Sequence, residues 1–470
     1  MNISLELRAA LSLSESMAGG LDTIVALATP PGRSAISVVR MSGRNALDIA
    51  QRVVRPWPID PRRSTLCTIS NQDHSQILDQ ALVTAFIAPE SFTGENLVEI
   101  SGHGGLYVPA VVMETLIACG ARQALPGEFS RRAVLNGKLD ITQAEAIGDL
   151  IDTRSRAMHR AALGQLDGGL SRRIAALRSS LISLESLIAY DIDFPEEDDG
   201  PIPREKVSTE VEMLLIALDA LLATVPIGEM IREGAVVVIA GQPNVGKSSL
   251  FNSILGQSRA IVTEIPGTTR DAIEGFVETN NWPIRLVDTA GLRDTEDTVE
   301  RIGIEVSERY LGWANVVLAC GDSEESLAAT LAALEGRTDA PIIRVRTKSD
   351  LEPETSPGVS PPSSADIRVS SELGEGLHAL IASVDEILTA TAGSIVADVP
   401  VLTRSRHIRG IHQARAEIAA FGEAWTRAAL PAPVAAVHLR TAATALESLI
   451  GAVSTDDVLD RVFSSFCVGK

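Results

Sequence analysis

Short apolar runs separated by turn residues characterise the N-terminal part of the chain. They predict strands at 36–40, 81–88 and 96–100, each bounded by Gly, Pro or polar residues, and a helix over 109–119. This pattern indicates a small α+β domain at residues 22–137.

A helical period governs two later segments, from about 140 to 222 and from 407 to 450, where apolar residues recur every three or four positions. Between them, at about 234–391, apolar runs of strand length alternate with helical patterns, as in an α/β domain. Helices on both sides of an insert predict one discontinuous all-α domain that closes around it. Two separate helical bundles are the alternative.

Composition narrows the classes of function. The net charge of −20 argues against a surface that binds nucleic acid broadly. The hydrophobic content of 45% is that of a globular protein, and we expect no apolar run as long as a membrane span. The four cysteines are scattered without a C-x-x-C pair, so neither a disulfide framework nor a zinc site is predicted. A cytoplasmic location is therefore expected.

The strongest chemical signal is Gly241-Gln-Pro-Asn-Val-Gly-Lys-Ser-Ser249, which follows the apolar run 235–240 and opens a helical pattern. Glycines let backbone N–H groups face a phosphate, and the helix N-terminus adds partial positive charge. Lys247 is expected to reach the β- and γ-phosphates, and Ser248 to hold Mg²⁺. The segment predicts a nucleoside triphosphate site, with a chance glycine turn as the alternative.

Further motifs follow in the order typical of a GTPase. Asp288-Thr-Ala-Gly291 suits a carboxylate on the Mg²⁺ side followed by a glycine that senses the γ-phosphate. Pro266-Gly-Thr-Thr-Arg-Asp271 lies where a first switch belongs, with Thr268 or Thr269 placed to close on Mg²⁺. Thr347-Lys-Ser-Asp350 offers a carboxylate to the guanine N1–H and N2–H₂, a donor pair that adenine lacks.

The predicted GTP-binding residues come from these motifs and from a late contact to the base at 369–374. They are Asn244, Val245, Gly246, Lys247, Ser248, Ser249, Thr263, Glu264, Ile265, Pro266, Gly267, Thr268, Thr269, Asp288, Thr289, Ala290, Gly291, Thr347, Lys348, Asp350, Ser370 and Ser371.

Two positions depart from the common GTPase pattern. Thr347 replaces the usual Asn, which predicts weaker guanine affinity with selectivity kept by Asp350. Leu292 stands where many relatives carry the Gln that orients the attacking water, so another group must do this. Asn244 is suited to bind a monovalent cation beside the phosphates. Glu300 can orient water through a relay, with a solvated helix residue as the alternative. A slow switch that needs an outside activator is the alternative.

Both ends of the chain resemble the MnmE or TrmE family of tRNA-modification GTPases. The N-terminal likeness rests on Asp22-Thr-Ile-Val-Ala, Ala28-Thr-Pro-Pro-Gly-Arg33, Ser91-Phe-Thr-Gly-Glu95, Gly102-His-Gly-Gly105, Pro126-Gly-Glu-Phe-Ser130 and Leu135-Asn-Gly-Lys-Leu-Asp140. The C-terminal likeness rests on Phe463-Ser-Ser-Phe-Cys-Val-Gly-Lys470.

The resemblance implies a set of ligands and their residues. A folate one-carbon donor, 5-formyl- or 5,10-methylene-tetrahydrofolate, would contact Arg40, Glu99, Lys138 and Lys470. Potassium would bind Asn244, Thr263, Ile265 and Thr268, and Mg²⁺ would bind Ser248 and Thr269. Glu300 and Lys247 would both be catalytic in GTP hydrolysis. Cys467 would be a nucleophile or acid, although a lone cysteine is more often a buried small side chain. His103 is either a base or a turn residue that holds backbone.

The expected activity is potassium-dependent GTP hydrolysis by a homodimer that associates through its N-terminal domain. With an FAD-containing partner of the MnmG type, in a heterotetramer, it would add a carboxymethylaminomethyl group to C5 of the wobble uridine, position 34, of certain tRNAs. A ribosome-assembly GTPase acting as an RNA-binding switch is the alternative, but it usually carries a basic appendage that the acidic sequence does not suggest. A membrane-remodelling or filament GTPase would need a lipid-binding basic face or a long coiled coil, and the sequence suggests neither.

The predicted division of the chain follows from these motifs. It comprises a disordered extension or early start (1–21), the α+β folate and dimerisation domain (22–137), the first helical part (138–230), the P-loop GTPase domain (231–392) and the second helical part with its tail (393–470).

Overall fold

The computed structural model describes residues 22–193, 203–257, 273–279, 281–288, 309–351, 366–393, 400–427, 432–451, 462–463, 466 and 469. The chain divides into two compact units, which we describe separately. The first unit joins Met1–Gly148 to Ile450–Lys470, and the second is Asp149–Leu449.

The first unit contains a mixed sheet whose strand order is β3-β4-β5-β6-β2-β1-β7. Its described strands are β1 (Ile24–Leu27), β2 (Ile36–Ser42), β3 (Val54–Arg55), β4 (Thr65–Ser70), β5 (Ile77–Phe86), β6 (Leu97–His103) and β7 (Arg122–Gln123). Neighbouring strands are antiparallel except β1 and β7. The helices are α2 (Ala46–Val53), α3 (Tyr107–Ala118), α4 (Glu128–Leu135) and α5 (Ile141–Ile151), which crosses the unit boundary.

Alternation along the central strands gives this sheet two different faces. Val39 pairs with Ile100 and both are buried in one cluster with Val112 and Leu116 of α3, so this face lies under the helices. The intervening residues project to the opposite face, because successive side chains of a strand alternate. That open face carries the cross-strand pair Arg40 and Glu99.

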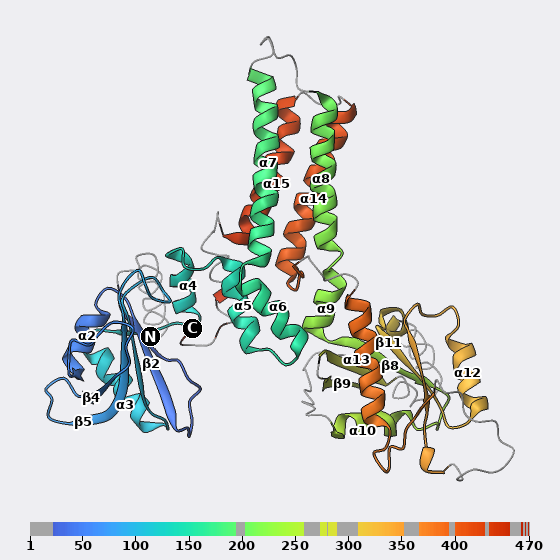
Figure 1. The fold of residues 1–470 in the computed structure, drawn as a ribbon, viewed down its shortest axis with the longest axis horizontal. Helices are drawn as coiled ribbons and strands as arrows, with labels where there is room; N and C mark the ends of the chain where they lie inside the picture. The colour runs from blue at the N-terminus through green and yellow to red at the C-terminus, as the bar shows by residue number, and fades with distance from the viewer. Residues whose placement is uncertain are drawn as a thin grey trace, which may run out of the picture. The chain divides into compact units, whose positions relative to one another are not determined.

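In the second unit, helices from before and after the insert pack into one bundle. The long helices are α7 (Gly169–Asp193), α8 (Arg204–Leu222), α14 (Ser405–Arg427) and α15 (Ala432–Ile450), and they run side by side (Figure 1). Ion pairs cross between the two arms, as between Arg178 of α7 and Glu447 of α15 at 2.5 Å. Arg415 of α14 likewise pairs with Asp219 of α8. Helices from the two sides of the insert therefore pack against each other.

The expectation that no apolar run matches a membrane span needs correction. Residues Arg204–Glu233 are long and apolar enough to cross a membrane by length and composition. This stretch is not one helix, because α8 ends at Leu222 and α9 (Val225–Glu233) follows it. Several of its apolar residues, such as Leu214 and Leu218, are buried in the protein, whereas Met213 and Ile216 are exposed. A bundle helix that packs on several neighbours is apolar over a wide arc, which explains the composition.

The insert is an α/β domain with strand order β13-β12-β11-β8-β10-β9, parallel except for β9. Its strands are β8 (Ala235–Gly241), β9 (Ile273–Glu278), β10 (Pro283–Asp288), β11 (Val316–Gly321), β12 (Ile342–Arg346) and β13 (Ile367–Arg368). The described helices are α10 (Lys247–Gln257), α12 (Glu324–Leu334), the short η2 (Ser349–Leu351) and α13 (Leu377–Gly393).

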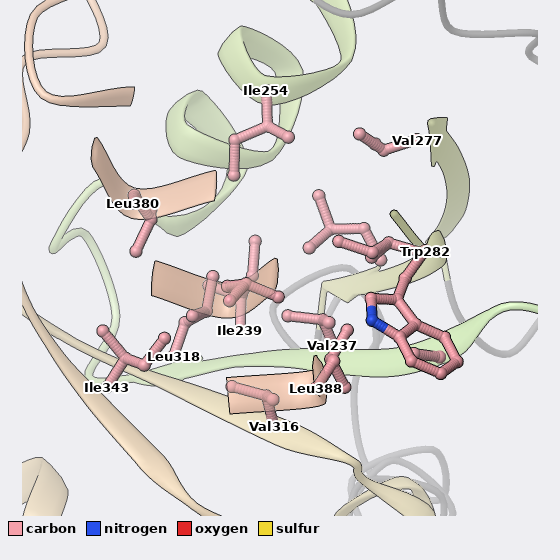
Figure 2. Close-up of a cluster of buried hydrophobic side chains, with 14 of the residues drawn as sticks. Val237, Ile239, Ile254, Val277, Trp282, Val316, Leu318, Ile343, Leu380 and Leu388 are labelled. Atoms are coloured by element: carbon pink, nitrogen blue, oxygen red, sulfur yellow. The ribbon is translucent and has the colours of Figure 1, made fainter. Parts of the chain in front are cut away.

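Figure 2 shows the main core of this domain, where Val237 and Ile239 of β8 lie with Leu318 of β11 and Leu380 of α13. All seven residues of β8 are buried or nearly so, as expected for the central strand of a parallel sheet covered on both faces. The loop that leaves β8 is therefore held on a rigid base.

The insert is clamped where it leaves and re-enters the helical part. The backbone N–H of Leu402 donates to Thr224 Oγ1 at 3.0 Å, just before α9 begins. Gly228 of α9 packs so closely on the same segment that an added Cβ would lie 1.9 Å from the Leu402 carbonyl oxygen. Gln165 of α6 (Arg156–Leu166) donates to the Val401 carbonyl at 3.2 Å.

Candidate functional site

The phosphate loop lies between the end of β8 and the start of α10, as its sequence predicts. Asn244 has φ 64° and Gly246 φ 94°, so the loop turns twice through backbone conformations that favour Asn and Gly. Lys247 is buried and its Nζ donates to the Gln242 carbonyl oxygen at 2.7 Å. The ammonium group therefore lies across the loop, within the turn that a phosphate would enter.

Ser248 and Asp288 meet although 40 residues separate them. The Ser248 hydroxyl donates to Asp288 Oδ2 at 2.7 Å, and Asp288 is 1% exposed at the end of β10. The contact forms because β8 and β10 are parallel neighbours, so both residues lie at the same edge of the sheet. A hydroxyl and a carboxylate oxygen are the ligands that Mg²⁺ prefers, and the pair fits that ion.

The TKxD segment contacts the phosphate loop through its first two residues. Thr347 is 2% exposed and its hydroxyl donates to the Val245 carbonyl oxygen at 2.5 Å. Lys348 Nζ donates to the Asn244 carbonyl at 2.7 Å and to Asp322 Oδ2 at 3.0 Å. The hydrogen bond from Lys348 lowers the pKa of Asp322. The hydroxyl of Thr347 thus ties the two motifs together at the position where Asn is usual.

The other residues expected to contact the guanine base also lie close together. Ser370 Oγ donates to Asp350 Oδ1 at 2.7 Å, which orients the carboxylate expected to meet guanine. The carbonyl oxygen of the adjacent Ser371 accepts from Ser253 of α10 at 3.1 Å. The segment that carries Ser370 and Ser371 therefore contacts both η2 and α10.

In the N-terminal unit, Arg40 and Glu99 form an ion pair at 2.8 Å, with side chains 23% and 27% exposed. The Arg40 guanidinium lies 5.6 Å from the centroid of the Phe92 ring and 5.9 Å from that of Phe129. Lys138 is exposed, and its Cγ would be 3.3 Å from a Cβ at Gly94. Arg40 and Glu99 are thus brought together, while Lys138 lies on the segment after α4 beside the 91–95 motif.

His103 is held by a carboxylate. Its backbone N–H donates to Asp79 Oδ2 at 2.8 Å, and its Nδ1 lies 2.6 Å from Asp79 Oδ1. Gly102 leaves room for this contact, since a Cβ there would lie 2.3 Å from Asp79 Oδ2. His103 is the last residue of β6, and its imidazole contacts a side-chain carboxylate and not backbone.

A charged network underlies the 126–130 motif. Arg132 donates to Asp22 Oδ1 at 2.7 Å and to Glu128 Oε1 at 3.0 Å, and Arg122 also contacts both carboxylates. Burial alone raises the pKa of Glu128, but the hydrogen bond from Arg122, with further help from Leu125 N–H and Arg132, lowers it below the ordinary value. The network joins α4 to Asp22, two residues before β1 begins.

The C-terminal tail contacts this same unit. A Cβ at Gly469 would lie 2.6 Å from the Leu27 carbonyl oxygen, and one at Gly127 would lie 2.7 Å from the Phe463 carbonyl oxygen. Gly469 therefore lies at the end of β1, the strand that pairs with Arg40 through Ala26. Phe463 is buried against Ile141.

Several predicted residues lie outside the described part of the chain. They are the extension 1–21 and Thr263, Glu264, Ile265, Pro266, Gly267, Thr268, Thr269, Thr289, Ala290, Gly291, Leu292, Glu300, Cys467 and Lys470.

Sequence reasoning missed two groups at these sites. Asp322, which binds Lys348, directly follows a buried strand, and that position could have identified it. Phe92 and Phe129 lie in the recognised motifs, but nothing local in the sequence shows that both rings flank Arg40.

Family models and curated relatives match nearly the whole chain. Residues 23–138 match the family model of the GTP-binding protein TrmE N-terminus, and residues 141–467 match that of the MnmE helical domain. The chain is 39% identical to the tRNA modification GTPase MnmE of Neisseria meningitidis serogroup A, over 97% of this chain and 100% of the relative. It is 40% identical to the MnmE of Laribacter hongkongensis, over 96% of this chain and 99% of that protein. A solved G domain of the T. maritima FeoB iron transporter covers 33% of this chain and 98% of its own length, at 25% identity and a TM-score of 0.25.

The phosphate loop, the TKxD segment and both flanking domains thus occur in a chain that resembles the two MnmE relatives over nearly its whole length. The chain belongs to the MnmE family of tRNA modification GTPases.

Proposed function

We propose that this chain hydrolyses GTP in a potassium-dependent reaction and so drives modification of tRNA. Together with an FAD-containing partner of the MnmG type, it would add a carboxymethylaminomethyl group to C5 of the wobble uridine. A reduced folate would supply the one-carbon unit. Hydrolysis would power opening and closing of paired GTPase domains rather than provide the reacting group.

One observation carries the nucleotide part of the proposal. Thr347 holds the carbonyl of Val245 in the phosphate loop, so the base-reading segment and the phosphate cradle form one connected site. Asp350, oriented by Ser370, is the group that we assign to the guanine N1–H and N2–H₂. An adenine at this position would leave the carboxylate unpaired, which disfavours ATP.

The same site fits two cations. Ser248 and Asp288 offer a hydroxyl and a carboxylate for Mg²⁺, which would neutralise charge on the phosphates. Asn244 is exposed in a left-handed turn of the loop and offers an amide oxygen of the kind that suits K⁺. We assign Thr263, Ile265, Thr268 and Thr269 to the same two ions from the family pattern, and Glu300 to the positioning of water.

The folate assignment is supported by the N-terminal unit. Glu99 can accept from the amino and ring N–H edge of a pterin, and Arg40 is a cation for a carboxylate. Both are partly exposed, and Phe92 beside them offers an aromatic surface. Gly469 lies against Leu27, which supports a role for the neighbouring Cys467 and Lys470 at this site. Lys138 completes the proposed contacts.

A homodimer through the N-terminal domain is supported by apolar side chains on the open face of its sheet. Leu66 of β4 lies opposite Leu82 of β5. Leu66 is 66% exposed and Leu82 is 48% exposed. Ile36 of β2 is 62% exposed. Exposed apolar residues grouped on one sheet face are typical of a surface that another protein covers.

The decisive experiment compares GTP hydrolysis in KCl and NaCl at equal ionic strength. We expect much faster turnover in K⁺, and loss of most of that advantage in Asn244→Ala, while the matched variant Asn252→Ala on α10 keeps it. Glu300→Ala should bind GDP normally but turn over slowly. Equal rates in the two salts would refute the potassium assignment, and normal turnover by Glu300→Ala would refute the assigned glutamate.

A further inference from the structure

A cavity of about 610 Å³ lies in the second unit where α6 and the start of α7 face the α/β insert. Its volume is in the range of small-molecule sites, which is roughly 300–1,000 Å³. It is separate from the phosphate loop, since none of its lining residues comes from residues 241–249.

The walls come from both domains and are largely apolar. They include Ala157, Ala161 and Gly164 of α6, Ile227 and Ile231 of α9, and Trp282 of the insert. Trp282 lies at the edge of the insert's core (Figure 2), and its indole N–H donates to Thr389 Oγ1 at 3.0 Å. These walls would favour an apolar body that buries its surface between them.

Hydrogen bonds already fix the two walls to each other. The backbone N–H of Ala157 donates to the Asn281 carbonyl oxygen at 2.9 Å. Asn281 is in turn bound through its N–H and side chain to Asp385 of α13. The cavity is therefore a built feature between anchored segments, and a ligand would not need to create it.

Charge at the cavity selects one class of ligand. Arg160 and Arg172 both line it and both are exposed, whereas Asp167 is the carboxylate among the lining residues. Arg172 pairs with Asp167 at 3.2 Å. Arg160 has no ion-pair or hydrogen-bond partner among the described residues. Within the part of the chain that the structure describes, one cation thus stands uncompensated at an apolar cavity, in a chain whose net charge is −20.

We propose that this cavity binds a small amphipathic anion, with its apolar body between α6 and Trp282 and its anionic group at Arg160. Fused aromatic rings or a medium-length acyl chain fit the apolar walls, and a carboxylate or sulfonate fits the guanidinium.

The test is a fluorescence titration of the full-length protein with 8-anilinonaphthalene-1-sulfonate, an apolar ring system that carries one sulfonate. Gly164→Leu and Gly393→Leu add bulk to the cavity from two different helices, α6 and α13. A Cβ at either glycine would meet nothing within 4 Å, so both variants should fold, as a thermal melt would verify. We expect saturable binding to the wild type and loss of that binding class in both variants.

Charge variants test the anionic contact. Arg160→Gln should weaken the affinity about three- to fivefold, the usual size for one partly exposed charge. Arg173→Gln removes a cation from α7 outside the cavity and should change nothing. Decanoate should displace the dye, and decyltrimethylammonium should not. Undiminished binding in both filled variants, or equal displacement by the two detergents, would overturn the proposal.

Discussion

The hydrogen bond from Thr347 to Val245 should control nucleotide affinity. Thr347→Val keeps the side-chain shape and removes only the hydroxyl, so the Val245 carbonyl loses its donor in a buried place. Leaving a buried acceptor without its partner costs about 1–2 kcal/mol. If that cost falls on the loop that must be ordered to bind phosphate, GDP affinity should fall about 5- to 30-fold.

Thr330→Val is the matched control, because it also removes a buried threonine hydroxyl bound to a backbone carbonyl. The Thr330 hydroxyl donates to the Ser326 carbonyl at 2.9 Å and to the Cys320 carbonyl at 3.1 Å, and neither acceptor belongs to residues 241–249. Both variants should lower the melting temperature to a similar degree. Only Thr347→Val should weaken the binding of a fluorescent GDP analogue, measured by titration and by its rate of release.

The GDP affinity and the melting temperature together test whether Thr347 orders the phosphate loop. A GDP affinity within twofold of the wild type, combined with a normal loss of stability, would mean that the loop holds its shape without Thr347. The departure from Asn at this position would then have no bearing on the nucleotide.

Three further changes have defined outcomes. Gly228→Ala should lower the free energy of unfolding of the second unit by about 1–3 kcal/mol in a denaturant titration, because the added Cβ would lie 1.9 Å from the Leu402 carbonyl oxygen. Gly164→Ala is the control and should not lower it, because a Cβ at Gly164 would meet open space. Glu128→Gln should remove a pH-dependent part of the stability of the first unit. Folding lowers the pKa of Glu128, so its contribution to the free energy of unfolding is present above its unfolded-state pKa of about 4.3 and is lost as the pH falls through the folded-state pKa. An unchanged dependence of the melting temperature on acidic pH would contradict this. Cys467→Ser should leave GTP hydrolysis intact and abolish tRNA modification, read by nucleoside mass spectrometry of wobble uridine, and normal modification would make the cysteine structural.

The local chemistry of the nucleotide site could be predicted from sequence, whereas its connections could not. Gly246 and Lys247 belong to a contiguous motif whose strand and helix flanks show in the apolar pattern. The contact of Thr347 with Val245 joins residues 102 apart and depends on the order β12-β11-β8, which no local pattern contains. Likewise, Arg40 meets Glu99 only because β2 and β6 pair in one register.

Short strands and polar positions explain why other elements could not be predicted in full. The strands β3 and β7 have two residues each, too short for any alternation to be read. The strand expected at 81–88 is β5, which begins at Ile77, where polar Asp79 and Gln80 hide the pattern. Asp79 is polar because it binds His103, so a local departure from the apolar pattern marks a tertiary contact.

The connections of the insert limit how a change at the nucleotide can reach the helical bundle. Strand β10 ends at Asp288, which holds Ser248, and begins directly after Trp282, which is bound to α13. A displacement of Asp288 along this six-residue strand must move Trp282 or strain the strand, because a packed sheet resists stretching. Trp282 adjoins α6 through the Asn281 carbonyl, so the first part of the bundle to respond should be α6.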